Sequence, residues 1–279
     1  MTGPLVDADW LGAHLDEVVV VDVRWYLDGR SGRAAHESGH LPGAVWADVD
    51  TDLSAPPTPG GGRHPLPTPE GFADRLGRLG IADDAVVVAY DDSGGAYAAR
   101  LVWLLRLLGQ RAHLLDGGIQ AWPGELETGA TTREPVTRTA VEWPAGAFRT
   151  ADTVRDSEVL LDARAHDRYT GQNVLPSDVR SGHIPGARSA FWGDNLNGDG
   201  TLAPVERLRA HYAALGVVPG ADVAVYCGSG VTACHDLLAL ERIGVRASLY
   251  PGSWSAWSAD TTRPIATGDG HSEEEQARA

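Results

Sequence analysis

Short, uninterrupted apolar runs alternate along this chain with longer segments that have the composition of helices. Residues 18–21 and 86–88 are all valine, which is typical of strands covered on both faces of a sheet. The stretches 69–80 and 204–216 each begin with proline and end with glycine, a pattern that predicts helices. Strands alternating with helices in this way predict an α/β fold, with mostly parallel sheets flanked by helices.

The same succession of motifs occurs twice along the chain. The hexapeptide Gly-His-Leu-Pro-Gly-Ala that begins at Gly39 recurs at Gly182 with isoleucine in place of leucine, and two strand-ending aspartates, Asp22 and Asp162, lie 140 residues apart. Four such landmarks keep their order, so we expect two homologous domains. The predicted boundaries are 1–132 and 149–267 for the domains, 133–148 for a proline-containing linker, and 268–279 for a disordered tail.

Composition narrows the classes of function. The 279 residues carry a formal net charge of −15, which disfavours a nucleic-acid partner because phosphate contacts need clustered cations. All 23 basic residues are arginine, so a lysine Schiff base and a Walker-type phosphate loop are both excluded. No apolar run approaches the roughly 20 residues of a membrane span. The first seven residues lack a basic and apolar leader, so we expect no secretory signal.

Cysteine usage points to a reducing compartment. The chain has two cysteines, Cys227 and Cys234, seven positions apart. They cannot supply a disulfide framework or a cysteine-rich zinc site. We therefore expect a reduced, cytoplasmic protein that has no metal, no organic cofactor and no membrane partner.

The segment around Cys227 carries the clearest chemical signal. An apolar run, residues 223–226, is followed by Cys227, a glycine-rich turn containing Gly228 and Gly230, and the start of a helix. At the carboxyl end of a parallel strand such a turn points backbone N–H groups inward, which stabilises a thiolate. A buried structural cysteine is the alternative on residue type alone, but the strand, the glycine spacing and the helix together favour a nucleophile.

This loop resembles the active-site loop of the 3-mercaptopyruvate sulfurtransferases, and the duplicated hexapeptide resembles a motif of rhodanese domains. The resemblance spans residues 5–267 and implies two tandem rhodanese-like domains, of which only the second is catalytic. The sequence agrees, because Asp91 stands in the first half where Cys227 stands in the second. The implied activity is sulfur transfer through a Cys227 persulfide to a thiol acceptor, such as thioredoxin or a small thiol, or to cyanide.

Two sulfur donors compete for this assignment. The Cys227 loop is neutral, including Val231 and Thr232, which suits a monoanionic 2-oxo carboxylate such as 3-mercaptopyruvate better than the thiosulfate dianion. The resemblance implies that Arg168 grips the substrate carboxylate. The family's second substrate arginine has no clear counterpart near residues 176–177, and Arg180 is the nearest candidate. Thiosulfate therefore stays open as an alternative donor.

The resemblance also implies a proton relay and a closing side chain. Ser229 lies two positions after the nucleophile, and His64 and Asp50 match the family's histidine and aspartate. Such a set could protonate the leaving enolate or activate the donor. Tyr97 matches a tyrosine of the first domain that closes over the substrate.

Other polar residues of the repeat are expected to be structural. His40 and His183 occur in both halves, including the half without a nucleophile, which indicates that they stabilise turns. Asp22 and Asp162 receive the same interpretation. Cys234 is expected to be a packing residue, with a role as a redox partner left open.

Two rival classes fit the sequence less well than a sulfurtransferase. The related dual-specificity phosphatases need an arginine six positions after the cysteine, where this chain has Ala233. A non-enzymatic persulfide carrier would keep the fold without the donor-binding residues, whereas this chain keeps Arg168 and the relay candidates.

Overall fold

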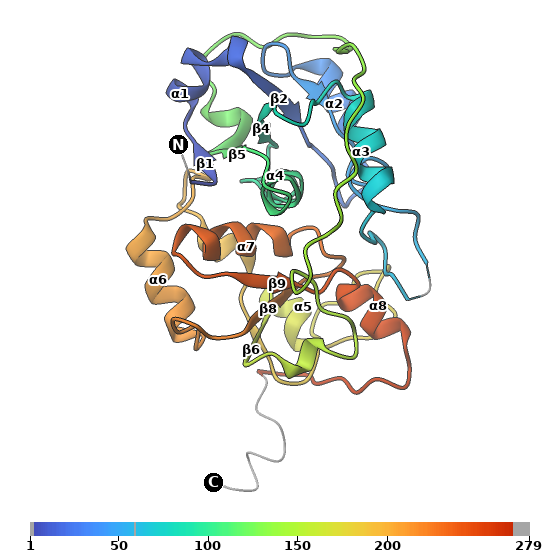
Figure 1. Ribbon diagram of the computed structural model, residues 1–279. Helices are drawn as coiled ribbons and strands as arrows, with labels where there is room; N and C mark the ends of the chain where they lie inside the picture. Colours follow the sequence, from blue (N-terminus) through green and yellow to red (C-terminus); the bar gives the residue numbers. More distant parts are fainter. Residues whose placement is uncertain (1–2, 59, 270–279) are drawn as a thin grey trace, which may run out of the picture. The chain divides into compact units, whose positions relative to one another are not determined.

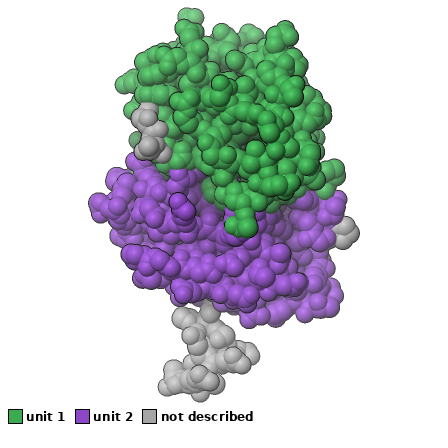
Figure 2. Space-filling view, viewed as in Figure 1, with its two compact units in different colours: residues 1–56, 66–145, 196–203 green, residues 57–65, 146–195, 204–279 purple. Residues whose placement is uncertain are grey.

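The computed structural model describes residues 3–58 and 60–269, which divide into two compact units (Figures 1 and 2). Unit 1 consists of Met1–Pro56, Leu66–Ala145 and Leu196–Ala203, and unit 2 of Pro57–Pro65, Gly146–Asn195 and Pro204–Ala279. The short segment 57–65 thus comes from the first half of the sequence but belongs to the second unit. Residues 270–279 of the expected tail lie outside the described residues.

Unit 1 is built on a five-stranded sheet in which every pairing is parallel, in the order β1-β5-β4-β2-β3. All five residues of the predicted valine strand, β2, are buried, as expected for a strand covered on both faces. The strands are β1 Leu5–Val6, β2 Val18–Asp22, β3 Val45–Trp46, β4 Val86–Tyr90 and β5 Ala112–Leu115. The helices are α1 Ala8–Ala13, α2 Gly32–Ser38, α3 Pro69–Arg78 and α4 Ala98–Leu107, with 3-10 turns η1 Leu15–Glu17 and η2 Gly118–Ala121.

Unit 2 repeats this plan with a four-stranded parallel sheet in the order β7-β6-β8-β9. The central strand β8 is buried throughout and lies between β6 and β9. The strands are β6 Val159–Asp162, β7 Ala187–Ser189, β8 Val223–Tyr226 and β9 Ala247–Leu249. The helices are α5 His166–Thr170, α6 Val205–Ala214, α7 Ala233–Arg242 and α8 Ser253–Ala259, with 3-10 turns η3 Val154–Asp156 and η4 Trp192–Asn195.

Both helices predicted from a leading proline are present as α3 and α6. The two-domain α/β prediction is confirmed by the two sheets and their flanking helices. Residues 133–148, the expected linker, contain no helix or strand. In the part of the chain that the structure describes, no helix is long and apolar enough to cross a membrane.

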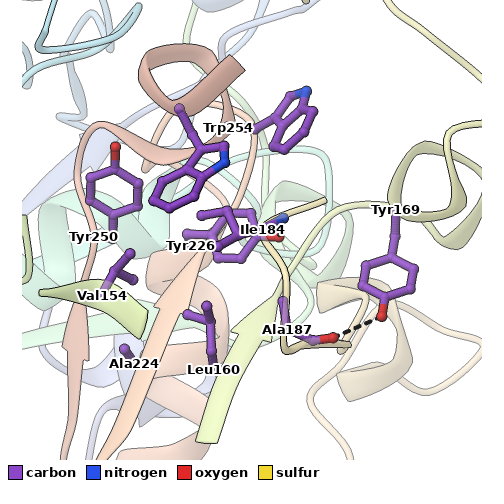
Figure 3. Close-up of a cluster of buried hydrophobic side chains, with 10 residues drawn as sticks. Val154, Leu160, Tyr169, Ile184, Ala187, Ala224, Tyr226, Tyr250 and Trp254 are labelled. Carbon is purple, nitrogen blue, oxygen red and sulfur yellow. Dashed lines mark hydrogen bonds between the residues drawn. The ribbon is translucent and has the colours of Figure 1, made fainter. Parts of the chain in front are cut away.

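An aromatic core supports the carboxyl end of the unit 2 sheet (Figure 3). Trp254 and Trp257 on α8 and Tyr226 at the end of β8 are fully buried in it. Large aromatic side chains contribute much of the apolar area that a core of this size buries. The core therefore fixes the start of α8 against the end of β8, where Cys227 follows.

Each unit also contains a buried ion pair at the end of its first long strand. In unit 1, Asp22 binds Arg24, whose Nη2 donates to the carbonyl of Gly39 at 2.7 Å. In unit 2, Asp162 binds Arg164, whose Nη2 donates to the carbonyl of Gly182 at 2.8 Å. These contacts join the strand ends to the repeated hexapeptides, which confirms the structural role predicted for both aspartates.

The repeated histidines serve the same turns. His40 Nδ1 lies 2.9 Å from the carbonyl of His36, and His183 Nδ1 lies 2.9 Å from the carbonyl of Tyr169. Both histidines are completely buried, and burial lowers the pKa of His183. An imidazole that donates from Nδ1 to a carbonyl explains both positions without catalysis.

Candidate active site

Cys227 lies directly after β8, and its sulfur faces the glycine-rich turn. The N–H of Gly230 donates to Cys227 Sγ at 3.1 Å, and α7 begins at Ala233. Gly230 has φ +80°, and a Cβ there would lie 2.6 Å from the carbonyl oxygen of Pro251, so this position requires glycine. The N–H donor and the nearby helix N-terminus both favour a negative sulfur.

The first residues of α8 hold the backbone of Cys227. Ser253 Oγ accepts the N–H of Cys227 at 3.2 Å, and the N–H of Trp254 donates to the Cys227 carbonyl at 2.9 Å. Ser253 has φ +50°, a left-handed conformation that costs free energy for a residue with a Cβ. The strained serine thus places a hydroxyl where a glycine would offer none.

The segment 57–65 brings two side chains to this loop. Gly62 has φ +77°, and a Cβ there would lie 2.6 Å from both the carbonyl of Gly252 and Ser255 Oγ, so the segment packs directly on the start of α8. The N–H of Arg63 donates to Ser255 Oγ at 3.1 Å. The following residue, His64, has Nδ1 2.7 Å from Ser229 Oγ.

The predicted pair Ser229 and His64 is therefore brought together two residues from the nucleophile. Both side chains are buried, with exposures of 8% and 6%. The short contact in a low-dielectric environment suits proton transfer between the hydroxyl and the imidazole. A proton could pass between this hydroxyl and imidazole two residues along the loop from Cys227.

Two guanidinium groups lie over Gly228, the residue after the nucleophile. A Cβ on Gly228 would lie 3.1 Å from Arg168 Nη2 and 3.1 Å from Arg63 Nη2. Asp178 accepts from both arginines, at 2.8 Å from Arg168 Nη2 and 2.9 Å from Arg63 Nη1. The absence of a side chain at Gly228 therefore leaves room for two cations next to the residue that follows Cys227.

Arg180 has a different setting. Its guanidinium donates to four backbone carbonyls, those of Trp257, Ser258, Asp260 and Arg263, at 2.6–3.1 Å. These bonds tie the end of α8 to the loop that carries Arg180. The second guanidinium beside Gly228 comes from Arg63 instead.

Val231 and Thr232 complete the turn before α7. Val231 is buried, and its carbonyl accepts the N–H of Cys234 at 3.1 Å. Thr232 is partly exposed and occupies the position before the first helical residue. Cys234 is buried on α7, where its Sγ contacts the carbonyl of Gly230 at 3.5 Å, and both cysteines are free thiols.

Asp50 and Tyr97, the remaining candidates, belong to unit 1. Asp50 is exposed and accepts a hydrogen bond from the indole of Trp25 at 3.0 Å. The ring of Tyr97 packs edge-on against the same indole at 5.3 Å between centroids. Burial raises the pKa of Tyr97 to about 12. Trp25 thus joins the two predicted residues within unit 1.

A buried polar cluster lies on the α7 side of the Cys227 loop. Asn195 Nδ2 donates to Asp236 Oδ1 at 2.7 Å, and Asp236 is completely inaccessible. Burial raises the pKa of Asp236 well above its usual range, and the negative charge of Cys227 raises it further. The raised pKa favours the neutral form of Asp236, which places less negative charge near Cys227 than a carboxylate would.

Taken together, a parallel α/β unit that delivers a cysteine into a glycine-rich turn, beside two arginines and a Ser-His pair, has the equipment of a thiol-dependent transferase. Residues 7–125 and 149–260 both match the model of the rhodanese-like domain. The chain belongs to the rhodanese family, and its relatives identify it as a sulfurtransferase.

The relatives extend over nearly the whole chain. A protein of Pseudomonas aeruginosa named "Probable 3-mercaptopyruvate sulfurtransferase" is 43% identical over 95% of this chain and 98% of its own. A Mycobacterium tuberculosis protein provisionally named a thiosulfate sulfurtransferase is 42% identical over 91% and 92%. The structure of 3-mercaptopyruvate sulfurtransferase from Leishmania major is similar with a TM-score of 0.83, at 33% identity, over 94% of this chain and 76% of that one.

Three residues of this site were not found by sequence reasoning. Arg63 directly precedes His64, and Asp178 lies next to the place where a second arginine was sought. Their contacts depend on the packing of Gly62 and Arg63 on the start of α8, which joins parts of the chain almost 200 positions apart. Ser253 carried a weak signal, because it replaces the second glycine of the matching Gly117-Gly118 pair.

Proposed function

We propose that this enzyme takes sulfur from 3-mercaptopyruvate, holds it as a persulfide on Cys227, and passes it to a thiol acceptor or cyanide. The observation that carries the proposal is the pair of guanidiniums beside Gly228, within reach of a donor whose sulfur meets Cys227 Sγ. A planar carboxylate pairs well with such groups. The neutral Cys227 loop adds no further positive charge.

The proposed first step balances without an external oxidant or reductant. The Cys227 thiolate attacks the donor sulfur, and the carbon–sulfur bond breaks with its electron pair on the pyruvate enolate. The thiol proton of the donor ends on the methyl carbon of pyruvate. Ser229 and His64, 2.7 Å apart, are the groups proposed to carry that proton.

In the second step an acceptor thiol attacks the outer sulfur, and the Cys227 thiolate leaves. The N–H of Gly230 stabilises that leaving thiolate as it did the attacking one. Because one nucleophile serves both steps, the kinetics should be ping-pong. A thioredoxin-like protein or a small thiol in the cytoplasm is the proposed acceptor, since both cysteines are free thiols that fit a reducing setting.

Thiosulfate is the second candidate donor. The Mycobacterium tuberculosis relative, 42% identical, favours it by its name, and two arginines could bind a dianion. The test compares kcat/KM for 3-mercaptopyruvate and for thiosulfate with one acceptor. We expect 3-mercaptopyruvate to be preferred, and a strong preference for thiosulfate would contradict the donor assignment.

The relay is tested with His64→Ala. Loss of the proton carrier should lower kcat for 3-mercaptopyruvate by about a hundredfold. Ser229→Ala should give a similar loss, and the double variant should be no worse than the single ones, since the two groups act as a unit. Unchanged turnover in His64→Ala would contradict the relay. A persulfide on Cys227 with no turnover from either donor would instead indicate a carrier.

A further inference from the structure

Asp178 shares one carboxylate between two arginines beside the nucleophile. Its side chain is 3% exposed, whereas those of Arg63 and Arg168 are 26% and 16% exposed. One carboxylate oxygen faces Arg63 Nη1 and the other faces Arg168 Nη2, at 2.9 and 2.8 Å. Arg63 Nη1 also donates to the carbonyl of Ser177 at 3.2 Å. The most buried charge of the three is therefore the negative one.

Both guanidiniums reach Gly228. Arg63 donates to Asp178 through Nη1, and its Nη2 lies 3.1 Å from the position that a Cβ on Gly228 would occupy. Arg168 Nη2 donates to Asp178 and also lies 3.1 Å from that position, with Arg168 Nη1 at 3.6 Å. Gly228 is bonded to Cys227, so Asp178 holds two cations next to the residue that follows the proposed nucleophile.

The net charge of Asp178 and its two arginines differs from that of the structural ion pairs. Asp162 and Arg164 in the same unit form a buried one-to-one pair with no net charge. Asp178 meets two arginines, so the three side chains retain one net positive charge. A donor with one carboxylate makes that group neutral, whereas a dianion leaves it with an unbalanced negative charge in a partly desolvated place.

We propose that Asp178 is a specificity-determining residue, the resident counter-ion of a donor site formed by Arg63 and Arg168, and that it sets the site to accept monoanionic donors. The inference rests on the proposed function for its reaction and adds the origin of donor selection. Arg63 supplies the second guanidinium of the site from the segment that also supplies His64. Removing the charge of Asp178 makes the site doubly positive and suited to a dianion.

The test measures kcat/KM for thiosulfate and for 3-mercaptopyruvate, with the same acceptor, and uses their ratio. Asp178→Asn is expected to shift the ratio toward thiosulfate by about tenfold, since one unit charge a few ångströms from the donor is removed in a partly screened site. Arg63→Gln is expected to shift it in the opposite direction by a similar factor. The double variant restores one net positive charge, so its ratio should return close to that of the wild type.

Two controls separate charge from structure. Asp178→Glu keeps the charge and should keep the ratio within about threefold. Asp222→Asn removes a carboxylate that pairs with Arg149 at the opposite end of β8 from Cys227, and it should leave the ratio unchanged. Thermal unfolding midpoints verify folding, and if Asp178→Asn does not fold, Arg63→Gln and Asp178→Glu carry the test.

A purely structural Asp178 would lower both kcat/KM values in parallel and leave the ratio constant. That result, or a ratio that moves toward 3-mercaptopyruvate in Asp178→Asn, overturns the proposal. The wild-type ratio reports separately on the proposed function. A wild type that prefers thiosulfate contradicts the donor assignment, while the shifts between variants still decide the role of Asp178.

Discussion

The loops that follow β4 and β8 occupy the same place in two copies of one fold, yet only the second carries the proposed nucleophile. In unit 1 the strand is followed by Asp91, whose carboxylate accepts four backbone N–H groups at 2.8–2.9 Å, those of Ser93, Gly95, Tyr97 and Ala98. In unit 2 it is followed by Cys227, whose sulfur accepts the N–H of Gly230. In both loops backbone N–H groups donate to the side chain that follows the strand, four to Asp91 and one to Cys227, and the identity of that side chain separates a structural anchor from the proposed nucleophile.

The surroundings of the two loops differ in charge as well. The position 140 residues before Arg168 is Asp28, which carries the opposite sign. Burial raises the pKa of Asp91, and the four N–H donors act in the opposite direction. Unit 1 has thus filled its turn with its own carboxylate, whereas unit 2 has the guanidiniums of Arg63 and Arg168 beside Gly228. Both copies of the fold provide the same turn, and the two turns differ in only a few side chains.

The largest effect is expected at the nucleophile itself. Cys227→Ser should reduce sulfur transfer by about a thousandfold or more, because an unactivated hydroxyl does not form the persulfide. Asp91→Cys, made in the Cys227→Ser background, should not restore turnover, because the loop alone is insufficient. Steady-state rates with cyanide as acceptor measure both. Recovery of activity in the double variant would show that the two loops are equivalent.

The next effect is on stability and falls in unit 1. Asp91→Asn places an amide NH₂ opposite two of the four N–H donors, so the free energy of unfolding should fall by about 2 kcal/mol. Chemical denaturation measures the change. Asp92→Asn, at the partly exposed neighbour, is the matched control and should have a smaller effect. A fully stable Asp91→Asn protein would show that the carboxylate does not anchor this turn.

A smaller effect on stability and kcat is expected at the residue that supports each loop from the start of a neighbouring helical turn. Gly118 in unit 1 and Ser253 in unit 2 have φ +60° and +50°, but only Ser253 offers a hydroxyl, to the N–H of Cys227. Ser253→Gly relieves the backbone strain and loses that hydrogen bond. Stability should therefore change by less than about 1 kcal/mol, while kcat falls several-fold. An unchanged kcat would mean that the strain has no catalytic purpose.

The smallest change in turnover at neutral pH is expected from a substitution of Asp236, the fourth residue of the helix that follows the Cys227 loop, α7. The fourth residue of the corresponding helix in unit 1, α4, is Leu101. Burial raises the pKa of Asp236, so the folded state holds its proton more tightly than the unfolded state. This contribution is present below the usual carboxyl pKa of 3.8 and is lost as pH rises toward the raised value. Asp236→Asn should keep near wild-type turnover at pH 7.

The same variant has a second readout in its pH profile. Unfolding free energies of wild type and Asp236→Asn, measured between pH 4 and 8, should show a less steep decline with pH for the variant. A large loss of turnover in Asp236→Asn would indicate that the acidic proton, and not only its neutrality, is needed beside Cys227. Parallel pH profiles would contradict the raised pKa.

Much of the fold followed from patterns that are local in the sequence. The valine runs became β2 and β4, and the proline-led stretches became α3 and α6, because apolar runs and helix ends depend on near neighbours. The duplication could be found because both copies keep the aspartate at the end of the strand and the Gly-His-Leu/Ile-Pro-Gly-Ala hexapeptide that follows it. Each of these features can be predicted from one short stretch of the sequence.

The site was only partly predictable for the opposite reason. Cys227 and Ser229 lie on one loop, and His64 was found through the family resemblance. Arg63 and Asp178 meet only because Gly62 packs against α8, and no local pattern records that contact. The guanidinium of Arg180, a plausible substitute by position, is instead bound to the carbonyls at the end of α8.

The central claim is that sulfur is held on Cys227 and nowhere else. It is tested most directly by mixing the protein with 3-mercaptopyruvate without acceptor and locating the added sulfur by peptide mass spectrometry. The account predicts one extra sulfur atom on the peptide containing Cys227, absent from Cys227→Ser and removed by cyanide. Extra sulfur on Cys234 alone, or turnover that continues without any sulfur on Cys227, would contradict it.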